Sequence, residues 1–415
     1  MKKKWMLTAV LVLTAVLLAG CTISPDGLSR LNRLAQGESL TDPDSDTVTI
    51  SRDLYERYRQ FDELLELMDV VDYYYYQEPN VTDMLQGASA GLLAGLQDPY
   101  TFYYTPEAWQ KMKEDDEGEY AGVGILISSN YKTGVCTISR VFRGSPAEAA
   151  GVQRGDILYR IGEDLYVVPE TLQDAVDIMR GTPGTSVDVT FLRDGEEITF
   201  NLTRANITVN QVESTMLTEE IGLIAVYEFA GKVDAEFEEA LNDLISRGAK
   251  GLIIDLRDNP GGWVDSAQQV GDLFMDAGDL CYLVYRDGTE DHCYPTRDGK
   301  IEIPLVTLVN ENSASASEIL TGALRERAGA TVVGVNTYGK GIVQAVLPIG
   351  SEGAGYQITI AEYRTPEGGA VHKVGLAPDV EIPLEEGDNG GYDFADSQRD
   401  PQLKKALEVM EEKLK

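Results

Sequence analysis

Histidine and cysteine are scarce in this chain of 415 residues, which contains two histidines and four cysteines. The histidines are His292 and His372, so the chain has few candidates for the histidine of a Ser-His-Asp triad. A histidine-rich metal site is excluded. We interpret His372 as a structural residue in a strand-like segment. The cysteine spacing does not fit a zinc site, so the sequence predicts neither a metal nor another cofactor.

The three cysteines that follow Cys21 are Cys136, Cys281 and Cys293. An odd number of cysteines cannot all pair within one chain. Cys136 lies in an apolar, strand-like segment and is expected to be buried. Cys281 and Cys293 could close a small loop in an oxidising compartment, and the sequence leaves open whether they are joined.

Basic residues are few relative to acidic ones. The chain has 35 Lys and Arg against 69 Asp and Glu, which gives a formal net charge of −34 at pH 7. Such a surface repels nucleic acid and anionic lipid. The charge therefore predicts no nucleic-acid partner, and it favours solubility rather than one specific ligand.

The N-terminus, residues 1–21, has the features of a secretory signal peptide. Lys2–Lys4 form a basic start, an apolar run extends from Met6 to Leu18, and small residues precede Cys21. Leu-Ala-Gly-Cys resembles the bacterial lipoprotein box, in which the cysteine becomes the lipid-bearing N-terminus. We expect lipidation at Cys21 and an extracytoplasmic protein anchored to a bacterial membrane. An uncleaved membrane anchor is the alternative.

Composition and periodicity divide the remainder of the chain. Residues 22–50 are rich in Ser, Thr, Asp and Gly, which is typical of a flexible tether. The helical pattern of residues 51–115 predicts a small N-terminal helical domain. Alternating strands and helices over residues 207–385 predict a largely parallel sheet covered by helices. Residues 386–415 are interpreted as a polar linker and an amphipathic terminal helix.

Residues 118–206 are interpreted as a separate domain of short strands. Residues 144–151 read Gly-Ser-Pro-Ala-Glu-Ala-Ala-Gly, and Gly-Asp-Ile follows at 155–157. This pattern resembles a PDZ domain over nearly its whole length. Such domains take an extended C-terminal peptide as an added strand and hold its carboxylate with backbone N–H groups. The resemblance implies a carboxylate-binding loop at Ala121, Gly122, Val123 and Gly124, for which an ordinary tight turn is the alternative.

Three polar corners lie within residues 207–385. Residues 255–262 read Asp-Leu-Arg-Asp-Asn-Pro-Gly-Gly, and consecutive glycine N–H groups there can hold an oxyanion. Residues 313–318 read Ser-Ala-Ser-Ala-Ser-Glu at a strand-to-helix corner, where backbone N–H groups are unpaired. Residues 339–344 read Gly-Lys-Gly-Ile-Val-Gln, and the glycines let other backbone pack close to the lysine.

Each corner also has a purely structural interpretation. Ser315 and Glu318 fit a capping box that would only start a helix, and the glycine pair could be a bare turn.

Residues 334–341 are a near miss to a phosphate-binding loop, but Gly341 stands where Ser or Thr should bind the metal. Nucleotide binding is therefore not expected.

Taken together, the three motifs and the PDZ-like domain ahead of them resemble the carboxyl-terminal processing proteases over about residues 51–415. The resemblance implies an α+β or α/β multidomain protein. Its protease core would be a crotonase-like ββα fold with an inserted PDZ domain and an N-terminal helical segment. It also implies that the helical segment and the terminal helix could pair two chains as a homodimer, as in some relatives.

The family's site residues are carried over by position. The resemblance implies that Ser315 is the nucleophile, Lys340 the general base and Gln344 the residue that orients the lysine. The implied oxyanion donors are the backbone N–H groups of Ala316 and of Gly261 or Gly262. The role of Glu318, which matches a neighbour of the nucleophile, stays open.

The chemistry of these residue types agrees with the resemblance. A serine hydroxyl is a poor nucleophile until a base takes its proton, and burial lowers the pKa of a lysine so that it can act as that base. Ser-Lys pairs are a known variant of the catalytic triad, so this chemistry needs no histidine.

We therefore expect a serine endopeptidase that cleaves extracytoplasmic proteins recognised by their C-terminal tails. The resemblance also implies that tail binding to the PDZ domain gates the active site. A non-catalytic PDZ lipoprotein, acting as a chaperone or scaffold, is the second hypothesis. A crotonase-like acyl-transfer enzyme acting on thioesters is the third, but it would not explain the PDZ segment.

Overall fold

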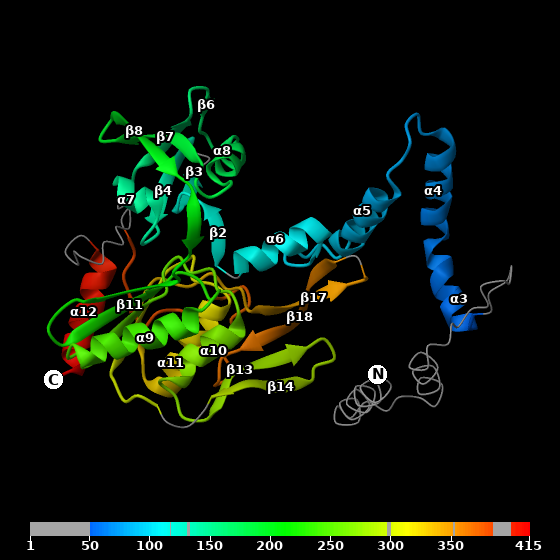
Figure 1. Ribbon diagram of the computed structural model, residues 1–415. Coiled ribbons are helices and arrows are strands. Elements are labelled where there is room, and N and C mark those ends of the chain that lie inside the picture. Colours follow the sequence, from blue (N-terminus) through cyan, green and yellow to red (C-terminus); the bar gives the residue numbers. More distant parts are fainter. Residues whose placement is uncertain (1–49, 117, 131–132, 297–299, 352, 385–399) are drawn as a thin grey trace, which may run out of the picture. The chain divides into compact units, whose positions relative to one another are not determined.

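The computed structural model describes residues 50–116, 118–130, 133–296, 300–351, 353–384 and 400–415, and Figure 1 labels its elements. The predicted signal peptide, Cys21, nearly all of the tether and the linker at 386–398 lie outside the described residues. The chain divides into two compact units, one ending at Leu85 and the other beginning at Gln86. Among the described residues, no helix is long and apolar enough to cross a membrane.

The first unit consists of helices. Its elements are α3 (Arg52–Tyr58), the 3-10 turn η1 (Arg59–Phe61), α4 (Asp62–Tyr74) and the start of α5 (Val81–Ala94). Helix α3 begins at Ser51, whose hydroxyl oxygen accepts a hydrogen bond of 3.2 Å from the backbone N–H of Leu54. No residue of α3 or α4 is buried, so the apolar side chains of these helices have no core of their own.

The end of the predicted helical domain joins a sheet of the second unit. After α5, the chain forms β1 (Phe102–Tyr104) and α6 (Pro106–Asp116). Strand β1 pairs antiparallel with β18 (Ala354–Arg364). Residues 51–115 therefore include a strand whose partner lies some 250 residues further along the chain.

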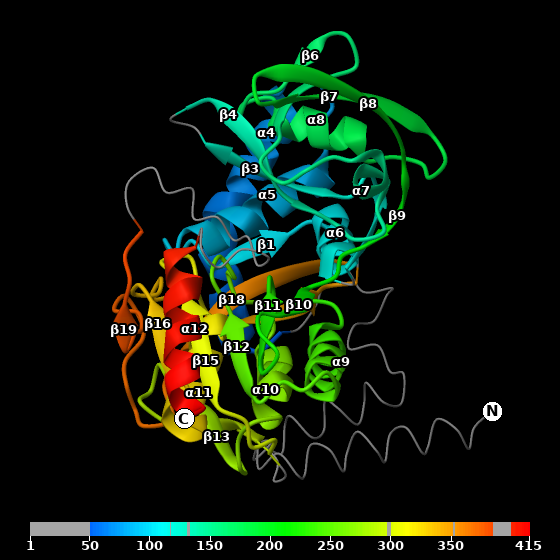
Figure 2. The same cartoon turned by 90° about the vertical axis from the view of Figure 1, so that its left-hand side faces the viewer.

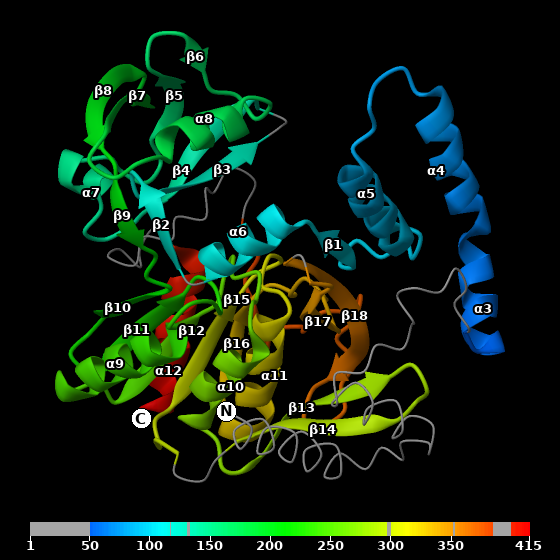
Figure 3. The same cartoon turned by 45° about the vertical axis from the view of Figure 1, so that its right-hand side comes forward.

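The PDZ-like segment folds into an antiparallel sheet in the order β3-β4-β5-β7-β8. Figure 3 shows this sheet together with the pair β2–β9 and helices α7 and α8. The strands are β2 (Glu119–Gly122), β3 (Ile125–Asn130), β4 (Val135–Val141), β5 (Ile157–Ile161), β6 (Leu165–Tyr166), β7 (Ser186–Arg193), β8 (Glu196–Thr203) and β9 (Ala205–Thr208). The helices are α7 (Pro146–Ala150) and α8 (Leu172–Met179).

The Gly-Ser-Pro-Ala motif of this segment is explained by helix α7. Ser145 caps the helix, since its hydroxyl accepts from the N–H of Glu148 at 3.1 Å, and Pro146 occupies the first helical position. Gly151 ends the helix with a φ of +90°, a conformation that favours glycine. Cys136 is fully buried in the core of this domain, as predicted.

The protease core contains the predicted parallel sheet, in the order β10-β11-β12-β15-β16-β19. Its strands are β10 (Val212–Met216), β11 (Ile221–Val226), β12 (Gly251–Asp255), β15 (Leu305–Val309), β16 (Thr331–Gly334) and β19 (Val380–Glu381). All neighbours pair in parallel except β10, which is antiparallel to β11. Strands β11, β12 and β15 are buried throughout, which explains their unbroken apolar runs.

Helices cover both faces of this sheet. Helices α9 (Val233–Ser246), α10 (Val264–Asp272) and α11 (Ala316–Ala328) bury one face in a cluster that includes Phe237 and Leu320. Helix α12 (Pro401–Lys413) buries the other face through Leu403, Ala406 and Met410. Figure 2 shows α12 lying along the strands β15 and β12.

A second sheet of the core is organised around β18, which pairs with β1, β13 and β17. Its other strands are β13 (Gly278–Tyr285), β14 (Glu290–Thr296) and β17 (Ile342–Ile349). The sequence pattern did not predict β14 or β18. In β18, polar residues interrupt the alternation of apolar residues that would indicate a strand. In the pairing of β13 with β14, Cys281 and Cys293 are directly opposite each other.

Candidate active site

Ser315 occupies the corner between β15 and α11. It is half-buried and has a φ of +56° and a ψ of −118°. A non-glycine residue in such a region costs on the order of 1–3 kcal/mol and persists only where the surrounding structure holds it. A strained serine on a strand-to-helix turn is the arrangement that exposes the nucleophile in α/β-hydrolases.

The two neighbouring serines have structural roles. Ser313 is fully buried and donates a hydrogen bond of 2.7 Å to the carbonyl of Leu256. Ser317 is also fully buried and donates to the carbonyl of Asn259 at 3.0 Å. Within the part of the chain that the structure describes, the Ser315 hydroxyl donates to no other residue. Ser315 is therefore the candidate nucleophile among the three.

The glycine corner packs directly against Ser315. A Cβ added to Gly261 would lie 2.8 Å from the Cβ of Ser315 and 3.0 Å from the backbone nitrogen of Ala316. The φ of Gly261 is +106°, which also favours glycine. Close backbone approach to the nucleophile is the geometry that an oxyanion hole requires.

The hydrogen bonds distinguish the N–H groups of this corner. The N–H of Gly261 donates to the side-chain oxygen of Asn259 at 2.9 Å. Among the described residues, no acceptor is bound by the N–H of Gly262 or of Ala316. Two of the three predicted donors thus have an N–H group available for a substrate oxygen, and the third is engaged within the protein.

Glu318 connects the serine corner to the lysine loop. Its carboxylate is fully buried and accepts hydrogen bonds from both segments. One oxygen accepts from the Thr337 hydroxyl (2.5 Å) and the Gly339 N–H (2.8 Å), and the other from the N–H groups of Ser315 (3.0 Å) and Lys340 (2.9 Å). Burial raises the pKa of this carboxyl, although the hydrogen bonds oppose that shift. Sequence analysis left the role of Glu318 open and offered a capping box, which the structure contains. The structure adds that the same carboxylate links two predicted catalytic residues, Ser315 and Lys340.

Lys340 is half-buried in the loop that precedes β17. Burial lowers the pKa of its ammonium group, and the charges of Asp98 and Glu318 oppose that shift. Its Nζ atom lies 4.6 Å from the centroid of the Tyr100 ring. In the described residues, no hydrogen bond joins Nζ to the Ser315 hydroxyl. Sequence analysis missed Tyr100, because nothing local relates it to the lysine loop.

Two further sequence expectations concern the lysine loop. The glycines beside Lys340 let segment 371–375 pack on the loop, since a Cβ on Gly341 would lie 2.6 Å from the Cα of His372. The predicted lysine-orienting residue, Gln344, donates to the Thr359 hydroxyl at 3.2 Å, and no contact of its side chain with Lys340 is found among the described residues. Its role stays a prediction.

An apolar groove lies in the PDZ-like domain, between β3 at the edge of its sheet and helix α8. It is a cavity of about 340 Å³. Gly122 and Val123 of the predicted carboxylate loop line it, whereas Ala121 and Gly124 do not. The remaining apolar lining residues are Ile125, Leu126, Ile127, Phe142, Leu172, Val176, Met179 and Val209. A strand edge beside an apolar groove is the arrangement that accepts an added peptide strand.

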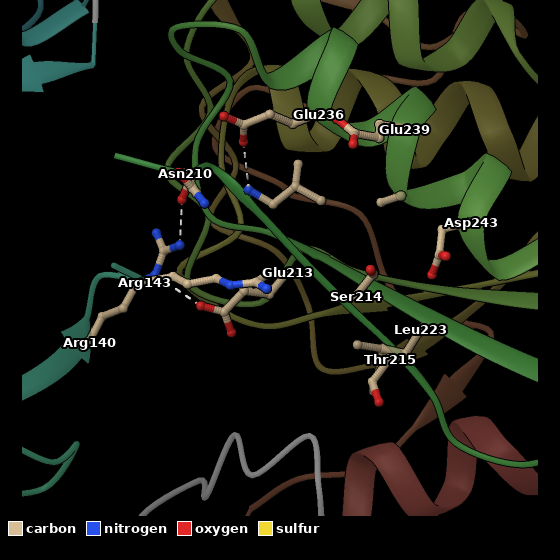
Figure 4. Close-up of a pocket in the computed structure, with 12 residues that line it drawn as sticks. Arg140, Arg143, Asn210, Glu213, Ser214, Thr215, Leu223, Glu236, Glu239 and Asp243 are labelled. Atoms are coloured by element: carbon tan, nitrogen blue, oxygen red, sulfur yellow. Dashed lines mark hydrogen bonds and ion pairs between the residues drawn. The ribbon is translucent and has the colours of Figure 1, made fainter. Parts of the chain in front are cut away.

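A larger cavity, of about 700 Å³, lies where β4 meets β10 and α9 (Figure 4). Buried Arg140 reaches from β4 to the Asn210 carbonyl and forms an ion pair with Glu213. Its guanidinium carbon also lies 3.7 Å from the ring centroid of Tyr227. Its walls come from β4 of the PDZ-like domain and from β10 and α9 of the core, and none of the predicted catalytic residues lines it.

Comparisons with known proteins agree with this geometry. Residues 220–382 match Peptidase family S41, and residues 137–193 match a PDZ domain. The "Carboxyl-terminal-processing protease" of Synechocystis sp. is 37% identical over 302 residues, which cover 71% of this chain and 70% of that protein. The chain belongs to peptidase family S41.

Other relatives extend the match of this S41 peptidase. The "Carboxy-terminal processing protease CtpA" of Bacillus subtilis is 31% identical over 386 residues, or 92% of this chain and 78% of that protein. The solved structure of a photosystem II D1 C-terminal processing protease has 28% identity and a TM-score of 0.51, and the match covers 80% of this chain and 94% of that chain. The protein is thus a serine-type peptidase of mixed α/β architecture with a PDZ domain.

Proposed function

We propose that this S41 peptidase is an endopeptidase that cleaves tail-bearing protein substrates with a Ser315–Lys340 dyad. The observation that carries the proposal is the strained backbone of Ser315 at the start of α11, with its φ of +56°. Strain of this kind is found at sites where position serves function. The shared carboxylate of Glu318 supports the pairing, since it binds the backbone N–H groups of both Ser315 and Lys340.

The proposed reaction follows from the chemistry of the two side chains. The neutral amine of Lys340 takes the proton of the Ser315 hydroxyl, whose oxygen attacks the scissile carbonyl. The lysine then gives the proton to the leaving amine, and an acyl-enzyme remains. Lys340 next activates a water molecule, which releases the new C-terminus. Burial of Lys340, which lowers the pKa of its ammonium, supports the role of base.

The oxyanion of the tetrahedral intermediate is assigned to the N–H groups of Ala316 and Gly262. Gly261 is the less suitable donor, because its N–H already donates to Asn259. The first turn of α11 adds the positive end of the helix dipole to this position.

Substrate tails are assigned to the groove between β3 and α8. A tail would add to the edge of β3 as a strand and place apolar side chains against Leu172, Val176 and Met179. Its terminal carboxylate would face the backbone of Gly122 and Val123. The apolar lining of the groove supports this assignment.

The test is cleavage of an unfolded protein with an apolar C-terminal tail by the full chain and by Ser315→Ala and Lys340→Ala. Each change is expected to reduce kcat/KM by on the order of 10⁴-fold or more. Exposed Ser246→Ala and Lys404→Ala are matched controls that should cut like the parent. If Ser315→Ala still cuts, the dyad is wrong. If the parent binds tails but never cuts them, a peptide-binding scaffold is the better explanation.

The cellular location is part of the proposal. Residues 1–21 support export and lipidation at Cys21, so the enzyme would act outside the cytoplasm on a bacterial membrane. Cells expressing the full chain should hold it in the membrane fraction and incorporate labelled palmitate, and Cys21→Ala should abolish the label. A parent chain that stays in the soluble fraction without label would contradict the anchor.

A homodimer through the N-terminal helices is also proposed. Leu54, Tyr58, Phe61 and Leu65 recur at three- and four-residue spacing along α3 and α4 and are 37–57% exposed. An exposed apolar stripe with that spacing is typical of paired helices. Light scattering of the detergent-solubilised chain should give a dimer, and Phe61→Asp should give monomers, whereas Glu66→Gln should not. A monomeric parent would overturn this proposal.

A further inference from the structure

The Tyr100 ring lies against the amine of Lys340, with 4.6 Å between Nζ and the ring centroid. Tyr100 belongs to the loop between α5 and β1, and its backbone is fixed to β18. Its carbonyl accepts from the Gln357 side chain at 3.0 Å, and the Thr359 N–H donates to the hydroxyl of neighbouring Thr101 at 3.0 Å. The backbone that carries the ring is therefore fixed to a strand of the sheet.

The hydroxyl of Tyr100 contacts the loop that carries Lys340. It lies 3.4 Å from the hydroxyl of Tyr338, which precedes Lys340 in the same loop. This hydrogen bond and burial raise the pKa of Tyr100 to about 12, so the side chain is a neutral phenol at physiological pH. The amine of Lys340 therefore lies near an apolar aromatic ring with a quadrupole, and not near a negatively charged phenolate.

The ring has two opposite effects on the charge of the amine. Contact with an aromatic face stabilises an ammonium, whereas loss of hydration destabilises it. Burial is the largest influence on Lys340 and lowers the pKa of its ammonium, so exclusion of water outweighs the attraction of the ring and favours the neutral amine. The charged groups that face Lys340 are Asp98 and Glu318, and both act against it by favouring the ammonium.

We propose that Tyr100 is a positioning residue of the peptidase, whose ring keeps water from the amine of Lys340 and holds that amine in reach of Ser315. The proposal rests on the Ser315–Lys340 dyad. It assigns a function to the segment Asp98–Thr101, which the sequence presented only as the end of a helix. Asp98 anchors this segment by accepting from the Tyr100 N–H at 3.0 Å and the Thr101 hydroxyl at 2.7 Å.

The test compares kcat/KM against pH for the full chain and its Tyr100→Ala and Tyr100→Phe variants. In Tyr100→Ala, water reaches the amine, so the acidic limb of the profile should move upward by about one pH unit. Such a shift would lower kcat/KM approximately tenfold near neutral pH, and kcat/KM would return to the parent value under alkaline conditions. Tyr100→Phe retains the ring, so its limb should stay at the position of the parent.

Folding of each variant is checked by circular dichroism. If Tyr100→Ala does not fold, Tyr100→Gln takes its place, because it keeps side-chain length but brings a polar group and water to the amine. An unshifted limb in the Ala or Gln variant overturns the proposal, as does an equal loss at every pH. Lys340→Ala separates the two hypotheses. If it still cuts, the dyad fails, and if it is inactive while Tyr100→Ala is unshifted, only the role of Tyr100 fails.

Discussion

Arg257 and Asp400 form a buried ion pair between the glycine corner and the C-terminal helix, with 2.7 Å between Nη2 of the arginine and a carboxylate oxygen of the aspartate. Their side chains are 0% and 1% exposed. Burial alone would lower the pKa of Arg257, but Asp255 and Asp400 outweigh it and raise that pKa. Asp400 also caps α12 by accepting from the Leu403 N–H at 2.9 Å. One aspartate thus fixes both the last helix and the strand end that leads to Gly261.

Asp400→Ala is therefore expected to destabilise the protein. The change removes one of the carboxylates that pair with the buried guanidinium of Arg257, and it also removes the cap of α12. Together these losses should lower the free energy of unfolding by about 3 kcal/mol. Urea denaturation measures the effect. Glu408→Gln, which breaks an exposed pair with Lys405 on the same helix, should stay within about 0.5 kcal/mol of the parent. Equal effects of the two changes would contradict the structural role of the pair.

Glu318→Gln should reduce activity more than its small change in size suggests. Each carboxylate oxygen accepts two hydrogen bonds, and an amide offers one oxygen and one NH₂ group. In the variant, the NH₂ group would face two N–H or O–H donors that previously had a carboxylate oxygen as acceptor. Their lost hydrogen bonds should cost about 1–3 kcal/mol. We expect kcat/KM to fall by roughly tenfold to a hundredfold while the protein stays folded. Full activity in this variant would show that the carboxylate does not hold the two loops.

The rate of cleavage should depend on pH through Lys340. Burial lowers the pKa of the ammonium, so the neutral amine that acts as base is present at a lower pH than for an exposed lysine. Activity should fall as the pH drops below that pKa and persist above it. Asp98→Asn removes a charge that favours the ammonium, so the acidic limb should move to lower pH. Asp243→Asn, on the surface of α9, is the control, and a limb that moves upward in Asp98→Asn would refute this electrostatic account.

Replacement of Ser315 should separate stability from activity. Both Ser315→Ala and Ser315→Gly remove the hydroxyl and should be inactive. Only glycine relieves the strain at a φ of +56°, so Ser315→Gly should be more stable than Ser315→Ala by roughly 1 kcal/mol. Thermal or urea unfolding of the two variants makes the comparison. A less stable glycine variant would mean that the backbone of Ser315 is not strained.

The glycines of the lysine loop provide a test of close packing. Gly341→Ala would place a Cβ against the backbone of His372, which cannot move away as a side chain could. We expect a loss of stability of about 2 kcal/mol and a large loss of activity, since the loop of Lys340 must shift. Gly87→Ala, in helix α5 with no atom within 4 Å of the new Cβ, should be neutral or stabilising by about 0.5–1 kcal/mol. Similar outcomes at both glycines would count against the packing argument.

The family, the PDZ domain and the parallel sheet could be predicted from the sequence because each has a pattern of residues that are close together in the chain. Runs such as Leu305–Val309 are apolar since they are buried on both faces, and the motif around Ser145 and Gly151 is a complete set of helix-capping residues. Strand β18 has no such local pattern. It was missed because its pattern depends on three neighbouring strands that are distant in sequence.

Residue types and local patterns were enough to predict which chemistry is present: a serine at a strand-to-helix corner, a lysine between glycines and a glycine corner ahead of them. How these parts are held depends on contacts that form only when the chain folds. Glu318 bridges the serine and lysine loops, and Tyr100 contacts Lys340 from a segment that is distant in the sequence. Capping preferences and hydrophobic periodicity act between residues a few positions apart. Contacts across hundreds of residues have no such spacing, because chain folding alone brings their members together.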